Sequence, residues 1–262
     1  MAKRSRQPRP GRSCAFCGGG PVTKEDASPK WIQRHLGQRS TISVVGSPGN
    51  PPERVFPSLS FTATVKKVCS SCNSGWMADL ENEASVLLKR MLDEKLSIAL
   101  SGDSLELLAR WAMKTALTLA LTQPMNPIPD TVYKEFFATR TPPTGTVIFL
   151  ARRAIERNPS GGHLIETELL DPNSNGRLGH LWIETFFLQN LVFQVVGYTL
   201  NVKAGPNVHF PQKFAPFIQG IWPARETVYW PPPTATLTER QTLEFAFALA
   251  KIRRKTMFDR DG

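Results

Sequence analysis

The chain has 262 residues, of which 41% are hydrophobic, and its formal net charge is +10. This length fits two domains, or one domain with a metal-stabilised extension, and the apolar content is enough for a real core. No run of about 18 uncharged apolar residues is present to span a membrane, and the basic, proline-rich start lacks the apolar segment of a secretory signal. We therefore expect a cytoplasmic protein without a membrane partner.

The excess positive charge is concentrated in the first third of the chain. Residues 1–76 contain 12 Lys and Arg against three acidic residues, whereas the other 186 residues contain 20 basic and 19 acidic ones. Such a concentrated field favours a polyanion as partner, most simply DNA or RNA. The basic residues that we expect to contact nucleic acid are Lys3, Arg4, Arg6, Arg9, Arg12, Lys24, Lys30, Lys66 and Lys67. A solvated tail that only aids solubility is the alternative for the first five of them.

In chain order, residues 1–12 predict a disordered basic arm. Residues 13–75 are rich in Gly, Ser and Pro and lack long apolar periodicity, as expected where a metal rather than a core fixes the fold. Short strands are predicted at 42–45 and 61–68. We expect Trp31 and Trp76 to pack this segment against the rest of the protein.

From Trp76 onward the apolar spacing becomes helical and then alternates as in strands. Helices are predicted at 77–95, 101–122, 130–139 and 236–255, the last with a cap formed by Thr238 and Gln241. Strands are predicted at 146–151, 163–169, 181–188, 191–200 and within 214–222, with a tight hairpin at Gln189–Asn190. The fold class is therefore α+β, with a helical and antiparallel-sheet domain over residues 81–262.

The four cysteines form two pairs with the spacing of a metal site. Cys14 and Cys17 make one Cys-x-x-Cys pair, and Cys69 and Cys72 make a second one after 51 intervening residues. Two such pairs supply four thiolates in the tetrahedral arrangement that zinc accepts, and because every cysteine is used, the ion is structural rather than catalytic. Two disulfides are the competing interpretation, which suits a chain without an export signal poorly.

The residues around these pairs resemble a known family. The first pair is followed by Glu25-Asp26 with Pro29 nearby, and the second continues as Cys72-Asn73-Ser74-Gly75-Trp76-Met77. This pattern is similar to the zinc-stapled branch of the HNH endonuclease superfamily and covers about residues 13–82. The resemblance implies a zinc-stapled, treble-clef-like ββα module at 13–80 that hydrolyses DNA. It also implies a catalytic Mg²⁺ or Mn²⁺ ion bound by Glu25 and Asn73, since hard oxygen ligands suit these ions.

One residue departs from the family pattern. The position of the general base, which is His in the family, is Asp26. Asp26 is then a weaker base or a second metal ligand, or His35 approaches from the helix that starts near Pro29, or the site is inactive and the module only binds. Glu25 and Asp26 have a simpler interpretation as acids at a helix N-terminus, and Asn73 as a helix N-cap.

Three functions remain open on the sequence alone. The first is a metal-dependent endonuclease that prefers DNA to RNA, and the second is an inactive relative that binds nucleic acid. The third is a zinc-organised module that docks a protein. No phosphate-binding Gly-Lys-Ser/Thr loop is present, so a nucleotide cofactor is not expected. The sequence indicates no oligomeric state.

Overall fold

The computed structural model describes residues 13–26, 30–36, 43–45, 54–56, 64–95, 97–123, 126–156, 160–170, 177–200, 211–224, 226–232 and 235–249. The basic arm at residues 1–12 lies outside this part of the chain, as do residues 250–255 of the predicted helix at 236–255. Within the described residues that helix is shorter than predicted, because it spans only Glu239–Ala246 and the backbone at Phe247 is no longer helical. The described residues form a mixed α+β fold with antiparallel sheets.

A small two-stranded sheet joins the two cysteine pairs. Strand β1 (Val22–Asp26) pairs antiparallel with β4 (Thr64–Cys69). Between these strands the chain forms helix α1 (Lys30–Leu36) and a hairpin of β2 (Ser43–Val45) and β3 (Arg54–Phe56). Strand β2 lies against β7 of the large sheet, so the insertion reaches across to another part of the molecule.

A long, kinked helical segment follows β4 directly. It consists of α2 (Ser70–Cys72), the π-helical segment η2 (Asn73–Met77) and α3 (Ala78–Asp93). The kink falls at Gly75, whose φ and ψ of −96° and −119° are not helical. The predicted N-cap role of Asn73 is wrong, because its φ and ψ of −68° and −49° are helical and the segment already starts at Ser70. Glu25 and Asp26 close strand β1 instead of opening a helix.

The large sheet has the strand order β10–β6–β9–β8–β7, with every neighbouring pair antiparallel. Its strands are β6 (Thr146–Arg152), β7 (Ser160–Leu170), β8 (Arg177–Leu188), β9 (Leu191–Leu200) and β10 (Ile218–Trp222). The predicted hairpin at Gln189–Asn190 joins β8 to β9, and Gln189 takes the positive φ of 51° that such a tight turn requires. A further pair of short strands joins β5 (Ile98–Leu100) to β11 (Val228–Trp230).

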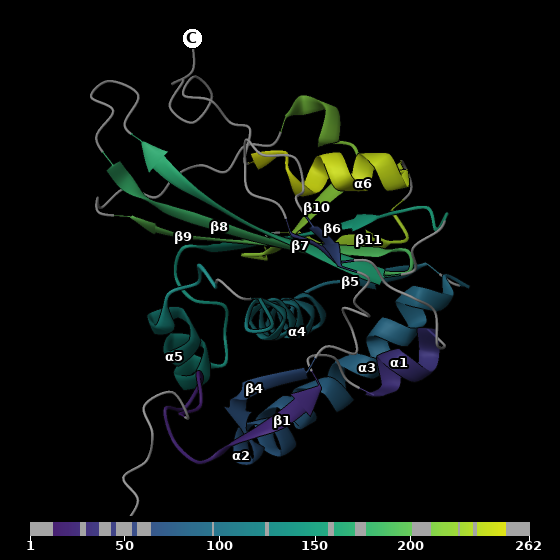
Figure 1. Cartoon of the computed structure of the whole chain (residues 1–262). Coiled ribbons are helices and arrows are strands. Elements are labelled where there is room, and N and C mark those ends of the chain that lie inside the picture. The colour runs from purple at the N-terminus through teal and green to yellow at the C-terminus, as the bar shows by residue number, and fades with distance from the viewer. Residues whose placement is uncertain are drawn as a thin grey trace, which may run out of the picture.

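Helices cover both faces of the large sheet (Figure 1). Helix α6 (Glu239–Ala246), which begins with the predicted capping box of Thr238 and Gln241, covers one face, and the 3-10 helix η3 (Gln212–Phe214) packs its Phe214 against Phe245 of α6. Helix α4 (Asp103–Ala120) covers the other face, beside α5 (Asp130–Thr139) and α3. The two-stranded β1–β4 sheet lies on the far side of α4 from the large sheet. Because α4 has neighbours on opposite sides, every residue from Trp111 to Leu121 is buried.

The cysteine segment and the large sheet share one core. Buried residues from Cys14 through α3 and α4 to Trp230 form a continuous hydrophobic cluster. The C-terminal end of α3 is fixed to the sheet domain by polar contacts as well, since the Met91 carbonyl accepts hydrogen bonds from Trp230 Nε1 at 2.8 Å and Asn190 Nδ2 at 3.3 Å. Glu94 adds two hydrogen bonds from Arg152 at 2.6 and 2.7 Å. The two predicted regions therefore pack as one body.

A buried carboxyl group lies in the middle of this core. Glu184 on β8 is 3% exposed, lies on the sheet face that carries Trp182 and Phe186, and its Oε2 has no hydrogen-bond partner among the described residues. Burial therefore raises the pKa of Glu184 well above its ordinary value. At a pH between the two pKa values, the Glu184 carboxyl group is protonated in the folded protein and ionised in the unfolded chain.

From the raised pKa of Glu184 we predict that the free energy of unfolding falls as the pH rises. A raised folded pKa means that the stabilisation is complete below the unfolded pKa of about 4.3 and declines as pH rises through the folded pKa, by up to about 1.4 kcal/mol per pH unit. We expect Glu184→Gln to remove this decline, so that its unfolding free energy exceeds that of wild type increasingly toward pH 8. Urea unfolding at several pH values, with exposed Glu226→Gln as control, measures the difference. Parallel pH profiles for wild type and Glu184→Gln would contradict the assignment.

Candidate metal centre

The first cysteine pair lies in a tight turn before β1. The Gly18 amide donates to the Cys14 carbonyl at 2.9 Å, and the Cys14 amide donates to the Gly19 carbonyl at 3.1 Å. Gly18 and Gly20 have φ values of 73° and 60°, which favour glycine, and a Cβ on Gly20 would also lie 3.2 Å from Cys69 Cβ. The Ala15 amide donates to the Lys67 carbonyl of β4 at 2.8 Å. The turn is thus fixed directly beside the second cysteine pair.

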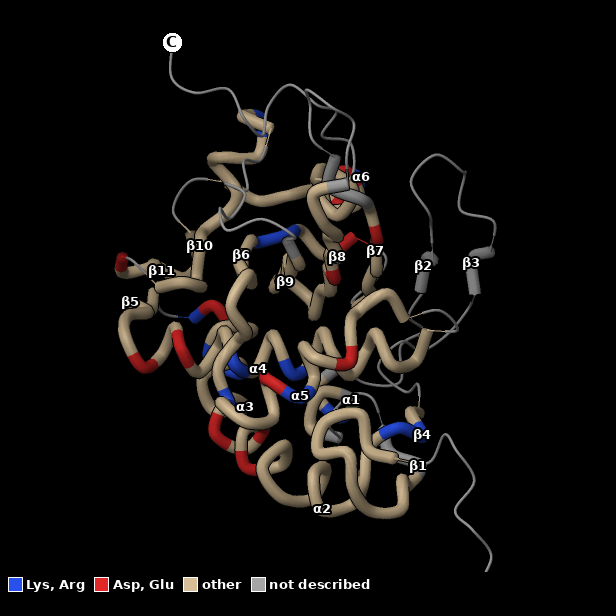
Figure 2. The backbone as a smooth tube through the Cα atoms, turned by 90° about the vertical axis from the view of Figure 1, so that its left-hand side faces the viewer, with Lys and Arg blue, Asp and Glu red and all other residues tan. Residues whose placement is uncertain are grey.

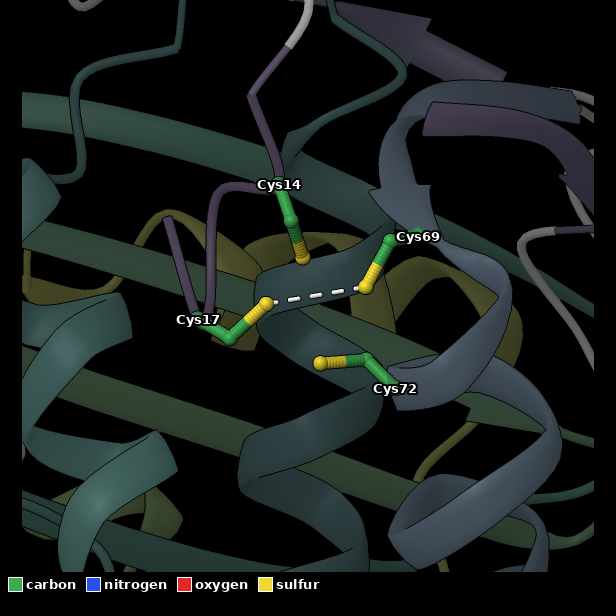
Figure 3. A group of neighbouring side chains, drawn as sticks. All are labelled: Cys14, Cys17, Cys69 and Cys72. Carbon is green, nitrogen blue, oxygen red and sulfur yellow. Dashed lines mark hydrogen bonds between the residues drawn. The ribbon is translucent and has the colours of Figure 1, made fainter. Parts of the chain in front are cut away.

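The second pair sits where a strand becomes a helix. Cys69 ends β4, and Cys72 ends the first helical turn, so the intervening two residues bring both sulfurs to the same side. All four Sγ atoms lie within 4.8 Å of one another, and those of Cys17 and Cys69 are 3.5 Å apart. Figure 3 shows the four side chains pointing toward a common centre. Zinc bonded to four sulfurs at about 2.3 Å separates those sulfurs by roughly 3.8 Å, so the spacing of this cluster is compatible with such an ion.

The donor set fits structural zinc. All four cysteines are described, none forms a disulfide, and three of them are buried while Cys17 is partly exposed. Burial raises the pKa of Cys17. For Cys69 burial acts in the same direction, but hydrogen bonds from the Ser71 hydroxyl and the Cys72 amide outweigh it and lower the pKa to about 6. Cys69 therefore supplies a thiolate readily, and four sulfur ligands leave no coordination position for a substrate.

Aromatic side chains connect this centre to α5. Phe16, between the first two cysteines, makes edge contacts with Trp76 and Tyr133 at ring-centroid distances of 5.6 and 5.3 Å. Trp76 in turn contacts Phe136 of α5 at 5.8 Å. The expected packing role of Trp76 is confirmed. The cysteine turn and α5 are therefore joined by one set of ring contacts.

A buried carboxylate connects α1, α3 and α4. Glu81 of α3 is 8% exposed, and its Oε2 accepts hydrogen bonds from Trp111 Nε1 at 2.9 Å and Trp31 Nε1 at 3.2 Å. Its Oε1 forms an ion pair with Lys114, which is itself 4% exposed. Trp31 thus packs the inserted helix α1 against the shared core, as expected. The ion pair was not predicted from the sequence, because Glu81 and Lys114 lie 33 residues apart in the chain.

The proposed catalytic residues come from three segments of the predicted module: the end of β1, the residue after Cys72, and α1. Glu25 and Asp26 end β1, where they pair with Val65 and Thr64, and their side chains are outside the described part of the structure, as are those of Lys24 and Lys30. Asn73 is partly buried just after Cys72, and His35 is exposed near the end of α1. Because the side chains of the two acids lie outside the described part of the structure, the catalytic metal site stays a prediction.

The described basic residues of the predicted nucleic-acid surface lie on β4. Lys66 and Lys67 are adjacent and both exposed, and Figure 2 shows β4 carrying positive charge. Lys3, Arg4, Arg6, Arg9 and Arg12 lie outside the described residues. A strand of a two-stranded sheet can expose neighbouring side chains on opposite faces, which is why both lysines reach solvent.

Comparison with known proteins identifies no relative: no family model, curated protein or solved structure matches the chain. Within the described residues, no helix has the length and apolar character needed to cross a membrane. The candidate metal site therefore rests on the geometry of the four cysteines and not on a known relative.

Proposed function

We propose that the chain is a metal-dependent endonuclease of the HNH type that acts on DNA. The observation that supports it most is the order of elements around the thiolate cluster. A cysteine turn leads into β1, β1 pairs with β4, and β4 leads into a helix that begins between Cys69 and Cys72. This strand–strand–helix order agrees with a zinc-stapled ββα module over residues 13–80. The acids Glu25 and Asp26 at the end of β1 agree with it as well.

In this proposal each of the named residues of the module has a separate role in the reaction. Glu25 and Asn73 would hold Mg²⁺ or Mn²⁺, and that ion would supply charge stabilisation for the scissile phosphate and the leaving oxygen. Asp26 accepts a proton from water as the water oxygen bonds to phosphorus and the bond from phosphorus to the leaving oxygen breaks. Lys66 and Lys67 bind backbone phosphates without reading the base sequence. The structural zinc takes no part in the reaction.

Asp26 also favours a second candidate function, an inactive relative that only binds nucleic acid. A carboxylate with an ordinary pKa of about 3.9 is a weak base, and a neighbouring cation weakens it further. Under this alternative the basic arm and β4 keep their role and hydrolysis is absent. A docking module for a protein is the remaining alternative, and its binding would not depend on phosphate contacts.

Plasmid cleavage by the full zinc-loaded chain in Mg²⁺, Mn²⁺ or EDTA tests the activity. Cleavage should require the added cation and disappear in Glu25→Ala and Asp26→Ala, while Glu226→Ala, exposed and outside the module, serves as the matched control. Asp26→His restores the residue of the family pattern and is expected to cleave faster than wild type, because imidazole is a stronger base at neutral pH. Cleavage that survives Asp26→Ala would make His35 the next base to test. No cleavage by wild type or Asp26→His would leave the binding function.

Binding to a DNA duplex at several salt concentrations separates the two remaining candidates. Phosphate contacts release counterions, so a nucleic-acid surface gives an affinity that falls steeply with salt. We expect Lys66→Ala/Lys67→Ala to lower the slope of log K against log salt by about 2, since each lost phosphate contact removes about 1. An affinity that is absent, or unchanged by salt and by this double variant, would favour the protein-docking alternative.

A further inference from the structure

Two buried donors beside the cysteine cluster have no partner among the described protein atoms. Trp76 Nε1 and Arg140 Nη1 are both buried without a hydrogen-bond acceptor. Buried donors are normally paired, because an unpaired one has lost its hydrogen bonds to water without replacement. Trp76 follows Cys72 by four residues on the same helical segment. The cysteine sulfurs are therefore the acceptors that we consider for these two donors.

Arg140 is held in place by its neighbours. It ends α5 with a φ of 60°, and its amide donates to the Phe136 carbonyl at 2.9 Å. Its guanidinium carbon lies 4.3 Å from the ring centre of Trp76 and also 4.3 Å from that of Phe137. This stacking fixes a cation against the same indole whose N–H lacks an acceptor.

The charges at this point agree with that placement. Burial lowers the pKa of Arg140 and the nearby Arg110 acts in the same direction, whereas the negative charge of Cys72 raises it. Burial raises the pKa of the Cys72 thiol, and the Trp76 side chain acts against that shift. Zinc held by four thiolates carries more negative than positive charge, so a cation and an N–H donor beside it are the groups that such a centre needs.

We propose that Trp76 and Arg140 form the outer shell of the metal centre, with the indole N–H donating to Cys72 Sγ and the guanidinium offsetting the excess thiolate charge. Both residues act through the cysteines and are positioning residues. Since Arg140 directly follows α5, this shell also links the metal centre to that helix. The inference concerns zinc retention and does not depend on nuclease activity.

The rate of zinc release to a chromogenic chelator from the full chain tests the proposal. We expect release to be 10- to 100-fold faster in Arg140→Gln, as for other outer-shell partners of metals, and close to wild type in Arg140→Lys. Trp76→Phe keeps an aromatic ring but removes the N–H, and should also release zinc faster. Exposed Lys134→Gln on the same helix is the matched control.

Cobalt substitution supplies a readout that a purely structural role would not move. Loss of a hydrogen bond to a thiolate raises the energy of its electrons, so Trp76→Phe should shift the sulfur-to-cobalt charge-transfer band to lower energy. Release rates of Arg140→Gln and Trp76→Phe within twofold of wild type, with an unshifted band, would overturn the proposal. Equal acceleration in Arg140→Lys and Arg140→Gln would overturn the part assigned to charge.

Discussion

Removal of zinc is expected to destabilise the whole protein and not only residues 13–80. A ligand that binds only the folded state stabilises it by about 4 kcal/mol when its free concentration is a thousand times Kd, and chelation removes that contribution. Here the cysteine turn also carries Phe16 to Trp76 and Tyr133, so the contacts with α5 depend on the same ion. Thermal unfolding with and without chelator, in wild type and Cys72→Ser, measures the effect.

The contrast between the variants makes this prediction specific. Wild type should lose stability on chelation, whereas Cys72→Ser should already be destabilised and respond little. Ser74→Ala, an exposed change two residues away, should behave as wild type. A melting temperature that is the same in wild type and Cys72→Ser, and that chelator leaves unchanged, would show that no metal supports the fold.

Replacement of Glu81 is expected to have the second large effect. Removing one partner of a buried ion pair leaves the other charge uncompensated, at a cost of about 3–5 kcal/mol. Glu81→Met would leave Lys114 in this state and deprive two indole N–H groups of their acceptor. Denaturant unfolding should give this loss for Glu81→Met and less than about 0.5 kcal/mol for exposed Glu83→Ala.

A double variant identifies the cause. Glu81→Met/Lys114→Met removes both charges and fills the space with apolar atoms, so it should recover much of the stability that Glu81→Met alone loses. If the double variant is less stable than the single one by the full cost of Lys114→Met, the two residues do not interact and the ion pair is not the reason.

The sequence predicted the secondary structure well wherever the apolar pattern was long and regular. The helix at 130–139 and the strand at 191–200 begin and end as predicted, because each is bounded by clear turn residues. The predicted capping box of Thr238 and Gln241 is confirmed for the same local reason. The helix predicted at 77–95 is confirmed as α3 at Ala78–Asp93. The helical turn at Ser70–Cys72 before it was missed, since no apolar period marks the residues between Cys69 and Cys72.

Of the site, sequence spacing predicted the cysteine cluster and missed its surroundings. Two Cys-x-x-Cys pairs indicate a shared metal site by themselves, so the cluster could be predicted although 51 residues separate the pairs. Arg140 contacts Trp76, and Lys114 contacts Glu81, only because of how α5 and α4 pack in the fold. No local sequence motif around Arg140 or Lys114 indicates these contacts. Strand β1 was also missed, because three of its five residues are charged. The catalytic roles of Glu25, Asp26 and Asn73 stay predictions from the family resemblance.

The metal content of the purified full chain tests the central claim most directly, because the fold of residues 13–80 and its contacts with α5 are built around the four thiolates. Elemental analysis should give one zinc ion per chain, and the cobalt form should show the visible bands and the charge-transfer band of a tetrahedral four-thiolate site. Each Cys→Ser variant should lose that spectrum. A metal-free, fully folded chain, or one in which the four cysteines form two disulfides, would contradict the account.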